Sequence, residues 1–268
     1  MTYCHHALSV IVSLNTGMPL EALNYLASLD FLKIRRELDY SELPTPWEVA
    51  NRYEVCDSND RVFMKVTEGS EPCDRLCFKP VQRGLVLRVT DMSGQEIARL
   101  KKDFKCCAGW GCCANFDCCA LEMFMESPVG RHLSSSRQMC SCCCPRFRVF
   151  DAYGKQMYDM NGPCCPCQVP GCTEDLEFPL SNPEGSYSGA KVTKIWDGMG
   201  RVCCTKTNTF GCHFPPRMDV KRKLSIFGSL FALDYVEFEN NGNGEFGDGG
   251  ESYPIYPSES YQADTGWA

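Results

Sequence analysis

The chain lacks an excess of positive charge. Its 268 residues contain 27 Lys and Arg against 34 Asp and Glu, which gives a formal net charge of −7. General nucleic-acid binding needs a basic surface, so this balance predicts that nucleic acid is not a partner. The length suffices for one large domain or two small ones, and a hydrophobic share of 44% suffices for a sizeable core.

Catalytic and targeting motifs are also missing. The four histidines occur in no catalytic or metal-binding spacing, and the glycines form neither a phosphate-binding loop nor a dinucleotide fingerprint. No cationic residue precedes the short apolar patch near the N-terminus, so a secretory signal peptide is not predicted. We therefore expect a protein without a covalent catalytic site, on the reducing side of a cell.

Long apolar segments are scarce. The main one runs from Leu224 to Val236 and follows a basic triplet at 221–223. About 13 residues at about 1.5 Å each extend about 20 Å, whereas a bilayer core is about 30 Å thick. The run is apolar on every side apart from Asp234, which indicates a buried or membrane-associated helix. A core helix, a short or tilted span and an interfacial helix all remain open for Leu224, Ile226, Phe227, Leu230, Phe231, Leu233 and Val236.

Cysteine, by contrast, is abundant, with 21 residues. In a reducing compartment this number implies lipid attachment, metal binding or plain burial. Clustered cysteines beside aromatic residues suit S-acylation near a membrane, where two or more acyl chains give stable anchoring. The first cluster therefore predicts lipid attachment at Cys106, Cys107, Cys112, Cys113, Cys118 and Cys119.

Two later clusters have a spacing that zinc sites use. Cys140 and Cys143 form one C-x-x-C pair, and Cys164 and Cys167 form another. Four such sulfurs in a tetrahedral array would bind zinc. A zinc site is therefore possible, but it is less favoured than lipid attachment at the first cluster.

Most of the chain has the pattern of short strands. Leucines at a spacing of three predict an amphipathic helix from Pro19, followed by a strand over 31–37. Arg52–Cys56 and Val62–Val66 predict strands around a polar turn. The segments 87–97, 147–157 and 193–203 each read strand, D-x-x-G, strand, which predicts three similar hairpins. Many hairpins indicate an antiparallel β domain.

The domain limits follow from composition. Residues 1–19 are expected to be a flexible leader, and 20–239 the folded domain. Residues 240–268 are rich in Gly, Ser, Tyr and acids, so we expect a disordered acidic tail.

These blocks, in this order, resemble the phospholipid scramblase family. The matching blocks are LEALNYLASLD (20–30), NRYEV (51–55), LRVTDMSGQEI (87–97), the cysteine-rich stretch, PRFRVFDAYGKQM (145–157), NGPCC (161–165), GAKVTKIWDGMG (189–200), TNTFGCHFP (207–215) and DVKRKLSIFGSLFALDYVEFE (219–239). The resemblance implies a mainly β fold: a closed antiparallel tubby-like barrel of about twelve strands around a central apolar C-terminal helix.

The resemblance also implies a function. Family members are described as moving phospholipids in both directions between plasma-membrane leaflets, in response to Ca²⁺ and without ATP. They are S-acylated at a stretch that corresponds to Cys106–Cys119, and are described as spanning the membrane at the C-terminal segment. The expected location is the cytoplasmic face of the plasma membrane, with phospholipids and the membrane as partners.

Two departures from the family pattern change these expectations. Lys206 and Arg217 stand where the family places acids in its Ca²⁺ segment, which leaves Asn208 and Asp219 as ligands. Ca²⁺ prefers several oxygen ligands that include carboxylates, so we predict weak or absent binding. Only about 19 residues precede the first helix, so adaptor domains that bind a Pro-rich arm are not expected. A lipid-tethered binding or regulatory protein without transport activity is therefore the alternative to a scramblase.

Overall fold

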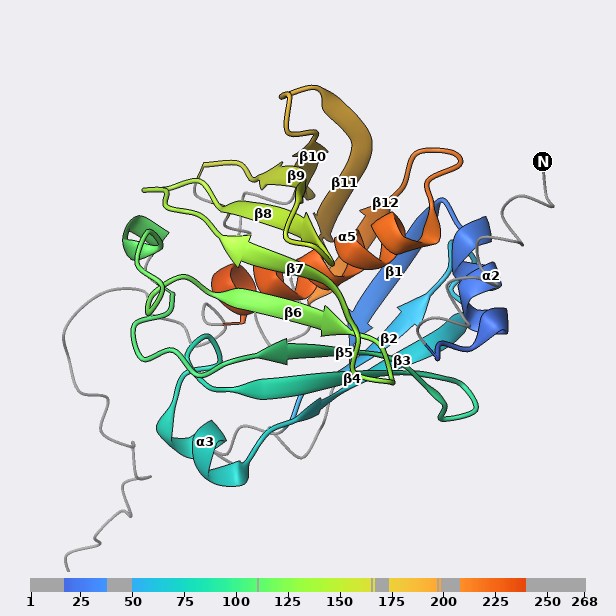
Figure 1. Ribbon diagram of the computed structural model, residues 1–268, viewed down its shortest axis with the longest axis horizontal. Coiled ribbons are helices and arrows are strands. Elements are labelled where there is room, and N and C mark those ends of the chain that lie inside the picture. The colour runs from blue at the N-terminus through green and yellow to red at the C-terminus, as the bar shows by residue number, and fades with distance from the viewer. Residues whose placement is uncertain are drawn as a thin grey trace, which may run out of the picture.

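The computed structural model describes residues 17–37, 50–109, 111–164, 166, 174–196, 198 and 208–239. Residues 1–16 of the predicted leader (1–19) and the whole predicted tail (240–268) lie outside the described residues. In the described part, twelve strands form one closed antiparallel barrel (Figure 1). The strands are β1 (Phe31–Arg36), β2 (Arg52–Cys56), β3 (Val62–Gly69), β4 (Leu85–Asp91), β5 (Glu96–Lys102), β6 (Glu122–Glu126), β7 (His132–Gln138), β8 (Arg146–Asp151), β9 (Gln156–Asn161), β10 (Leu176–Ser181), β11 (Tyr187–Ile195) and β12 (Thr209–His213).

Every strand pairs with its neighbours in sequence, and β1 closes the barrel by pairing with β12 from Phe31↔His213 to Arg35↔Thr209. Closure removes the unpaired strand edges that would invite aggregation. Side chains alternate between the two faces of each strand. In β1, for example, Leu32 and Ile34 are fully buried, whereas the residues that alternate with them are partly exposed. The predicted fold class is confirmed.

Helix α5 (Val220–Leu233) runs through the inside of the barrel (Figure 1). Asp219 caps its first turn by accepting a hydrogen bond from the Arg222 backbone N–H at 3.1 Å. The chain then continues as a π-helical turn, η3 (Asp234–Phe238). Because strands surround α5, it packs against apolar side chains in every direction, which explains its lack of a polar face.

All seven residues proposed for the core or membrane helix are buried in this core: Leu224, Ile226, Phe227, Leu230, Phe231, Leu233 and Val236. The core-helix interpretation of the segment is thus the one that the structure adopts. In the described part of the chain, no helix combines the length and the apolar character needed to cross a membrane.

Helix α2 (Leu20–Ser28) lies next to the start of α5. Its buried face includes Leu23 and Leu26, in agreement with the predicted amphipathic helix. The Lys223 ammonium group is buried and donates to the backbone carbonyls of Leu26, Ala27 and Leu29. These carbonyls lie at and just beyond the C-terminal end of α2, where a cation is favourable because the last carbonyls of a helix are short of backbone donors. Lys223 thereby joins α2 to α5.

Two of the three predicted D-x-x-G hairpins are confirmed, as β4–β5 and β8–β9. In the first, the Asp91 carboxylate accepts hydrogen bonds from the backbone of Ser93 and Gln95 at 2.9 and 2.8 Å. Gly94 adopts φ +84°, a conformation that favours glycine. Asp151 and Gly154 repeat this arrangement in the second hairpin.

The third hairpin prediction is wrong. Strand β11 ends at Ile195, and its partner is β12 in the register Thr193↔Gly211 and Ile195↔Thr209. The other edge of β11 pairs with β10, as in Thr193↔Glu177, so no edge remains for the predicted second strand, whose residues 201–203 lie outside the described part of the chain. A short D-x-x-G match does not by itself fix which later segment pairs with the strand, because pairing depends on the rest of the sheet.

The barrel has two chemically different ends. Strand direction alternates, so the connections that follow odd-numbered strands all lie at one end. Apart from Cys56 and Cys212, which lie in strands, every cysteine in the described residues belongs to the connections after β3, β5, β7 and β9. We call these connections (the described parts of 70–84, 103–121, 139–145 and 162–175) the cysteine-rich end. Figure 1 shows two of them, with α3 (Pro72–Cys77) in one, gathered on the left of the barrel.

Candidate functional site

The connection from β5 to β6 carries the cysteines predicted to be acylated. It consists of short turns and one 3-10 turn, η2 (Gly111–Cys113). The structure brings all six cysteines to the cysteine-rich end, but it does not expose them equally. Four are exposed (Cys106, Cys107, Cys112 and Cys118), Cys113 is half-buried, and Cys119 is buried at 7% exposure.

The thiols of this connection occur as neighbouring pairs. The sulfur atoms of Cys106 and Cys107 are 3.5 Å apart, and those of Cys118 and Cys119 are 3.7 Å apart. Burial, followed by the neighbouring Cys118 thiol, raises the pKa of Cys119 to about 12. Acyl transfer to sulfur requires access and thiolate character. Cys118 is therefore a much better acceptor than its neighbour Cys119.

The cysteine-bearing connection is held against its neighbours by hydrogen bonds. Gln82, which follows α3, donates its side-chain N–H to the Cys106 carbonyl at 2.8 Å. On the other side, the Ser141 backbone N–H donates to the Gly111 carbonyl at 3.1 Å. The three connections after β3, β5 and β7 thus form one continuous surface.

Exposed apolar side chains lie on the same surface. Leu76, Phe78, Phe104 and Phe116 have exposed fractions of 55, 38, 51 and 65%. The rings of Phe78 and Phe104 pack edge to face with centroids 4.8 Å apart. Large apolar side chains exposed together in this way mark a surface that contacts a membrane or another protein.

The later cysteines are arranged differently from the predicted zinc knuckles. The Cys140 thiol donates to the Cys112 carbonyl at 3.2 Å. The sulfur atoms of Cys143, Cys144 and Cys164 converge instead and all lie within 4.8 Å of one another, with Cys144 and Cys164 joined by a disulfide. Cys167 lies outside the described residues.

The two ligands left in the Ca²⁺ segment lie far apart. Asn208 donates its side-chain N–H to Asp234 at the end of α5, at 3.1 Å. Asp219 caps the start of α5 and pairs with Arg222 at 3.2 Å. The 14 residues of α5 separate these ends by about 21 Å. Asn208 and Asp219 therefore cannot bind the same ion, so the described residues of the segment do not fit a Ca²⁺ site.

The two substituted positions of this segment carry cations. Arg217 lies in the connection from β12 to α5 and adopts φ +68°. Lys206 lies outside the described residues. Ca²⁺ dependence of the protein stays a prediction from these substitutions.

A buried polar network holds the end of the core helix, and sequence reasoning did not find it. The Glu68 carboxylate of β3 and the Arg83 guanidinium are both fully buried. They form an ion pair in which Glu68 Oε1 and Arg83 Nη2 lie 3.1 Å apart. It also accepts hydrogen bonds from the hydroxyls of Tyr235 and Ser70, at 3.0 and 2.7 Å. Burial acts to raise the pKa of Glu68, but Arg83 and these hydrogen bonds outweigh it, and the pKa is lowered.

A second acid of the network is Asp234, the single acid noted in the apolar run. It is fully buried, and it accepts hydrogen bonds from the Tyr53 hydroxyl at 3.0 Å and from Asn208 at 3.1 Å. Burial, followed by the charge of Glu239, raises the pKa of Asp234 to about 7. Glu239 itself pairs with Arg36 at 2.9 Å and so fastens the chain beyond η3 to β1.

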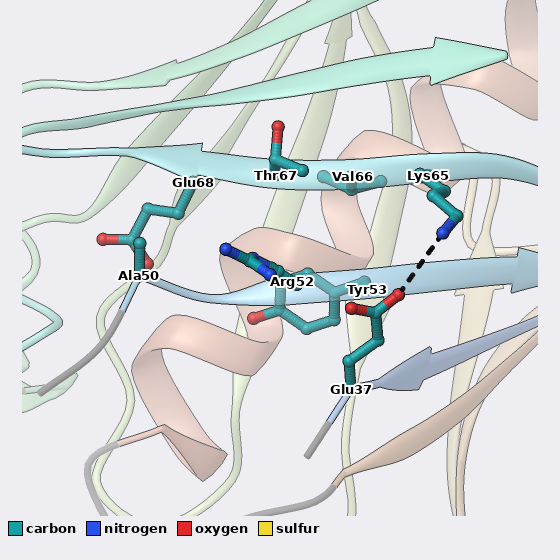
Figure 2. A pocket seen from close by; sticks show the side chains of 8 residues that line it. All are labelled: Glu37, Ala50, Arg52, Tyr53, Lys65, Val66, Thr67 and Glu68. Atoms are coloured by element: carbon teal, nitrogen blue, oxygen red, sulfur yellow. Dashed lines mark ion pairs between the residues drawn. The ribbon is translucent and has the colours of Figure 1, made fainter. Parts of the chain in front are cut away.

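A pocket of about 350 Å³ opens beside this network, between the ends of β1, β2 and β3. It is lined by Glu37, Ala50, Arg52, Tyr53, Lys65, Val66, Thr67 and Glu68. Figure 2 shows Glu37 and Lys65 pointing toward each other, and their ion pair spans 3.8 Å. The volume is at the lower limit of small-molecule sites.

The structure defines a class of protein: a closed β-barrel wrapped around its own C-terminal helix, with an apolar, thiol-rich end. The Scramblase family model matches residues 9–240. The chain therefore belongs to the scramblase family, and membership in this family implies association with a membrane.

Three curated relatives show the extent of the similarity. Phospholipid scramblase 1 of Homo sapiens is 29% identical over 223 residues, which cover 83% of this chain and 67% of that protein. Phospholipid scramblase 1 of Mus musculus is 31% identical over 224 residues (83% and 65%). Phospholipid scramblase family member 5 of Homo sapiens is 27% identical over 220 residues (82% and 78%). The chain spans about two thirds of the length of the first two.

One solved structure, of a protein from Arabidopsis thaliana, covers 77% of this chain and 93% of its own at 10% identity. Its TM-score of 0.37 is too low to bear on fold or function.

Proposed function

We propose that the protein is a phospholipid scramblase that moves phospholipids in both directions between membrane leaflets without ATP. The observation that carries this proposal is the match of most of the chain to the scramblase family. The proposed location is the cytoplasmic face of the plasma membrane. No covalent bond of the lipid changes in such a movement, so a lipid transporter needs no catalytic residue.

The cysteine-rich end is the proposed membrane-facing surface. Acyl chains attach at the exposed thiols of Cys106, Cys107, Cys112 and Cys118, and each chain adds membrane affinity of about 0.8 kcal/mol per buried CH₂. The exposed rings of Phe104 and Phe116 lie on the same connection as these thiols. Acyl chains and rings would therefore enter the same leaflet together.

Helix α5 remains inside the barrel in the proposed mechanism. Its side chains are already buried among the strands, and the network around Glu68 and Asp234 fixes its end. Moving the helix into a bilayer would leave these polar groups without partners, which costs free energy in an apolar environment. We therefore assign lipid movement to the cysteine-rich end, which faces the membrane, rather than to an inserted helix.

Reconstitution tests the proposed activity. The purified protein is placed in liposomes that carry a fluorescent phospholipid, and dithionite quenches the label from outside. Quenching beyond the outer-leaflet fraction, without ATP, is the expected result. Addition of Ca²⁺ should change the rate little, because Asn208 and Asp219 cannot share an ion.

A tethered binding protein without transport activity is the second candidate. The pocket between β1, β2 and β3 is the observation that favours it, because its volume reaches the lower limit of small-molecule sites. Quenching that stops at the outer-leaflet fraction, with folded protein on the liposomes, would support this candidate and contradict scrambling.

A further inference from the structure

The three converging cysteine sulfurs of the cysteine-rich end belong to two neighbouring connections. Cys143 and Cys144 lie in the bend between β7 and β8, and Cys164 follows β9. Cys143 and Cys164 are exposed, and Cys144 is half-buried. Adjacent side chains point in opposite directions along an extended strand, but a bend allows Cys143 and Cys144 to face the same point.

The backbone around the thiols is fixed on both sides. The Gly162 N–H donates to the Pro145 carbonyl at 2.8 Å, which ties the two connections together next to the cysteines. A Cβ at Gly162 would lie 2.5 Å from a ring carbon of Phe178, so only glycine allows this approach. The Ser141 hydroxyl donates to the Cys144 carbonyl. The position of the three sulfurs is thus determined by packing and hydrogen bonds that do not depend on the sulfurs themselves.

A disulfide alone does not account for this arrangement. Cys144 and Cys164 are joined by a disulfide in the structure, which uses two of the three sulfurs. Cys143 offers a third sulfur within 4.8 Å of both. Zinc binds sulfur at about 2.3 Å in tetrahedral sites, which places the ligand sulfurs about 3.8 Å apart. Sulfurs that already lie within 4.8 Å of one another need only a small movement to reach that separation, and three thiolates are a ligand set of a thiophilic metal ion.

We propose that in the reduced protein Cys143, Cys144 and Cys164 bind one Zn²⁺ ion as thiolates, with solvent as the fourth ligand. Two molecules of a monothiol such as glutathione first reduce the Cys144–Cys164 disulfide and leave joined as one oxidised dimer. Zn²⁺ then displaces the three thiol protons. The bound ion links the β7–β8 and β9–β10 connections at the cysteine-rich end. This site is independent of the proposed lipid transport.

Metal binding by the full chain tests the site without a membrane. The protein is reduced, loaded with Zn²⁺ in the absence of oxygen, and dialysed against a competing chelator. We expect the chain to retain about one ion more than the triple variant C143S/C144S/C164S. Cobalt in place of zinc should give a sulfur-to-metal charge-transfer absorption that the triple variant lacks. The variant C142S is the matched control, because Cys142 is an exposed thiol of the same bend outside the cluster.

A second measurement needs no variant and so does not depend on folding of a mutant. Bound zinc should protect Cys143, Cys144 and Cys164 from alkylation, as read by peptide mass spectrometry, while Cys142 reacts freely. Equal alkylation of all four thiols in the zinc-loaded protein would overturn the proposal. Unchanged metal retention and cobalt absorption in a folded triple variant would overturn it as well.

Discussion

The Tyr235 hydroxyl donates a hydrogen bond to the Glu68 carboxylate at 3.0 Å, across 167 residues of chain. It connects the end of the core helix to β3 inside the barrel. Glu68 also pairs with Arg83, and both side chains are fully buried. The end of α5 is therefore fastened by polar groups as well as by apolar packing.

Removal of Arg83 should destabilise the barrel strongly. The variant R83M leaves Glu68 buried without its cation, and broken buried pairs lose about 3–5 kcal/mol of unfolding free energy. The double variant E68Q/R83M should recover much of that loss, because position 68 no longer carries a buried charge without its Arg83 partner. Urea unfolding measures the free energy of unfolding of both variants.

The matched control is R148M at the more exposed Arg148–Asp159 pair, which spans 3.1 Å. Exposed pairs contribute about 0–1 kcal/mol, so this change should be small. Equal losses of unfolding free energy in R83M and R148M would contradict the role assigned to the buried Glu68–Arg83 pair.

Asp234 should make the stability depend on pH. Its pKa is raised to about 7 by burial, so the folded state keeps a proton that the unfolded chain releases near pH 4. The folded state then binds more protons between these values, and stability falls as pH rises through this window. The pKa of Asp234 is also influenced by four neighbouring groups: Glu239, Arg36, Lys194 and the Tyr53 hydroxyl.

The variant D234N removes the titrating group but keeps its size. It should be more stable than the wild type at pH 8, on the order of 4 kcal/mol for a pKa raised by about three units, with little change at pH 4. Some pH dependence should remain, because burial also raises the pKa of Glu237 to about 7. Denaturant unfolding at several pH values measures the difference. An identical pH slope in both proteins would refute the assignment.

Acylation should distinguish two adjacent cysteines. Cys118 is exposed, whereas Cys119 is buried with a pKa of about 12. C118A should reduce thioester-linked lipid, read by hydroxylamine-dependent labelling in cells, and C119A should leave it unchanged. Replacing Cys106, Cys107, Cys112 and Cys118 together by Ala should release the protein from membranes. Full membrane retention of that variant would count against the cysteine-rich end as the membrane-facing surface.

Local patterns predicted an antiparallel β domain, and the D-x-x-G turns at Asp91 and Asp151 are kept in the structure. The closed barrel itself was expected only from the resemblance to the scramblase family. The β11–β12 connection could not be predicted in this way, because its pairing is set by the closed sheet.

The candidate sites were predictable only in part. The six clustered cysteines could be identified from sequence, but the difference between Cys118 and Cys119 depends on tertiary burial. Glu68 and Arg83 look like ordinary surface charges in a strand and a loop. Asp234 stood out as a lone acid in an apolar run, but the sequence did not show that it belongs to a buried polar network.

The position of α5 during lipid movement is the most direct test of the account. A Cβ at Gly228 would lie 3.9 Å from the Cβ of Met125 on β6, a separation that suits a disulfide. The variant M125C/G228C, once oxidised, locks the helix inside the barrel. Its scrambling in liposomes is measured by albumin extraction of a fluorescent lipid, since dithionite is itself a reductant. We predict equal rates for the oxidised and the reduced variant, whereas loss of activity on oxidation and recovery on reduction would show that the helix must leave the barrel.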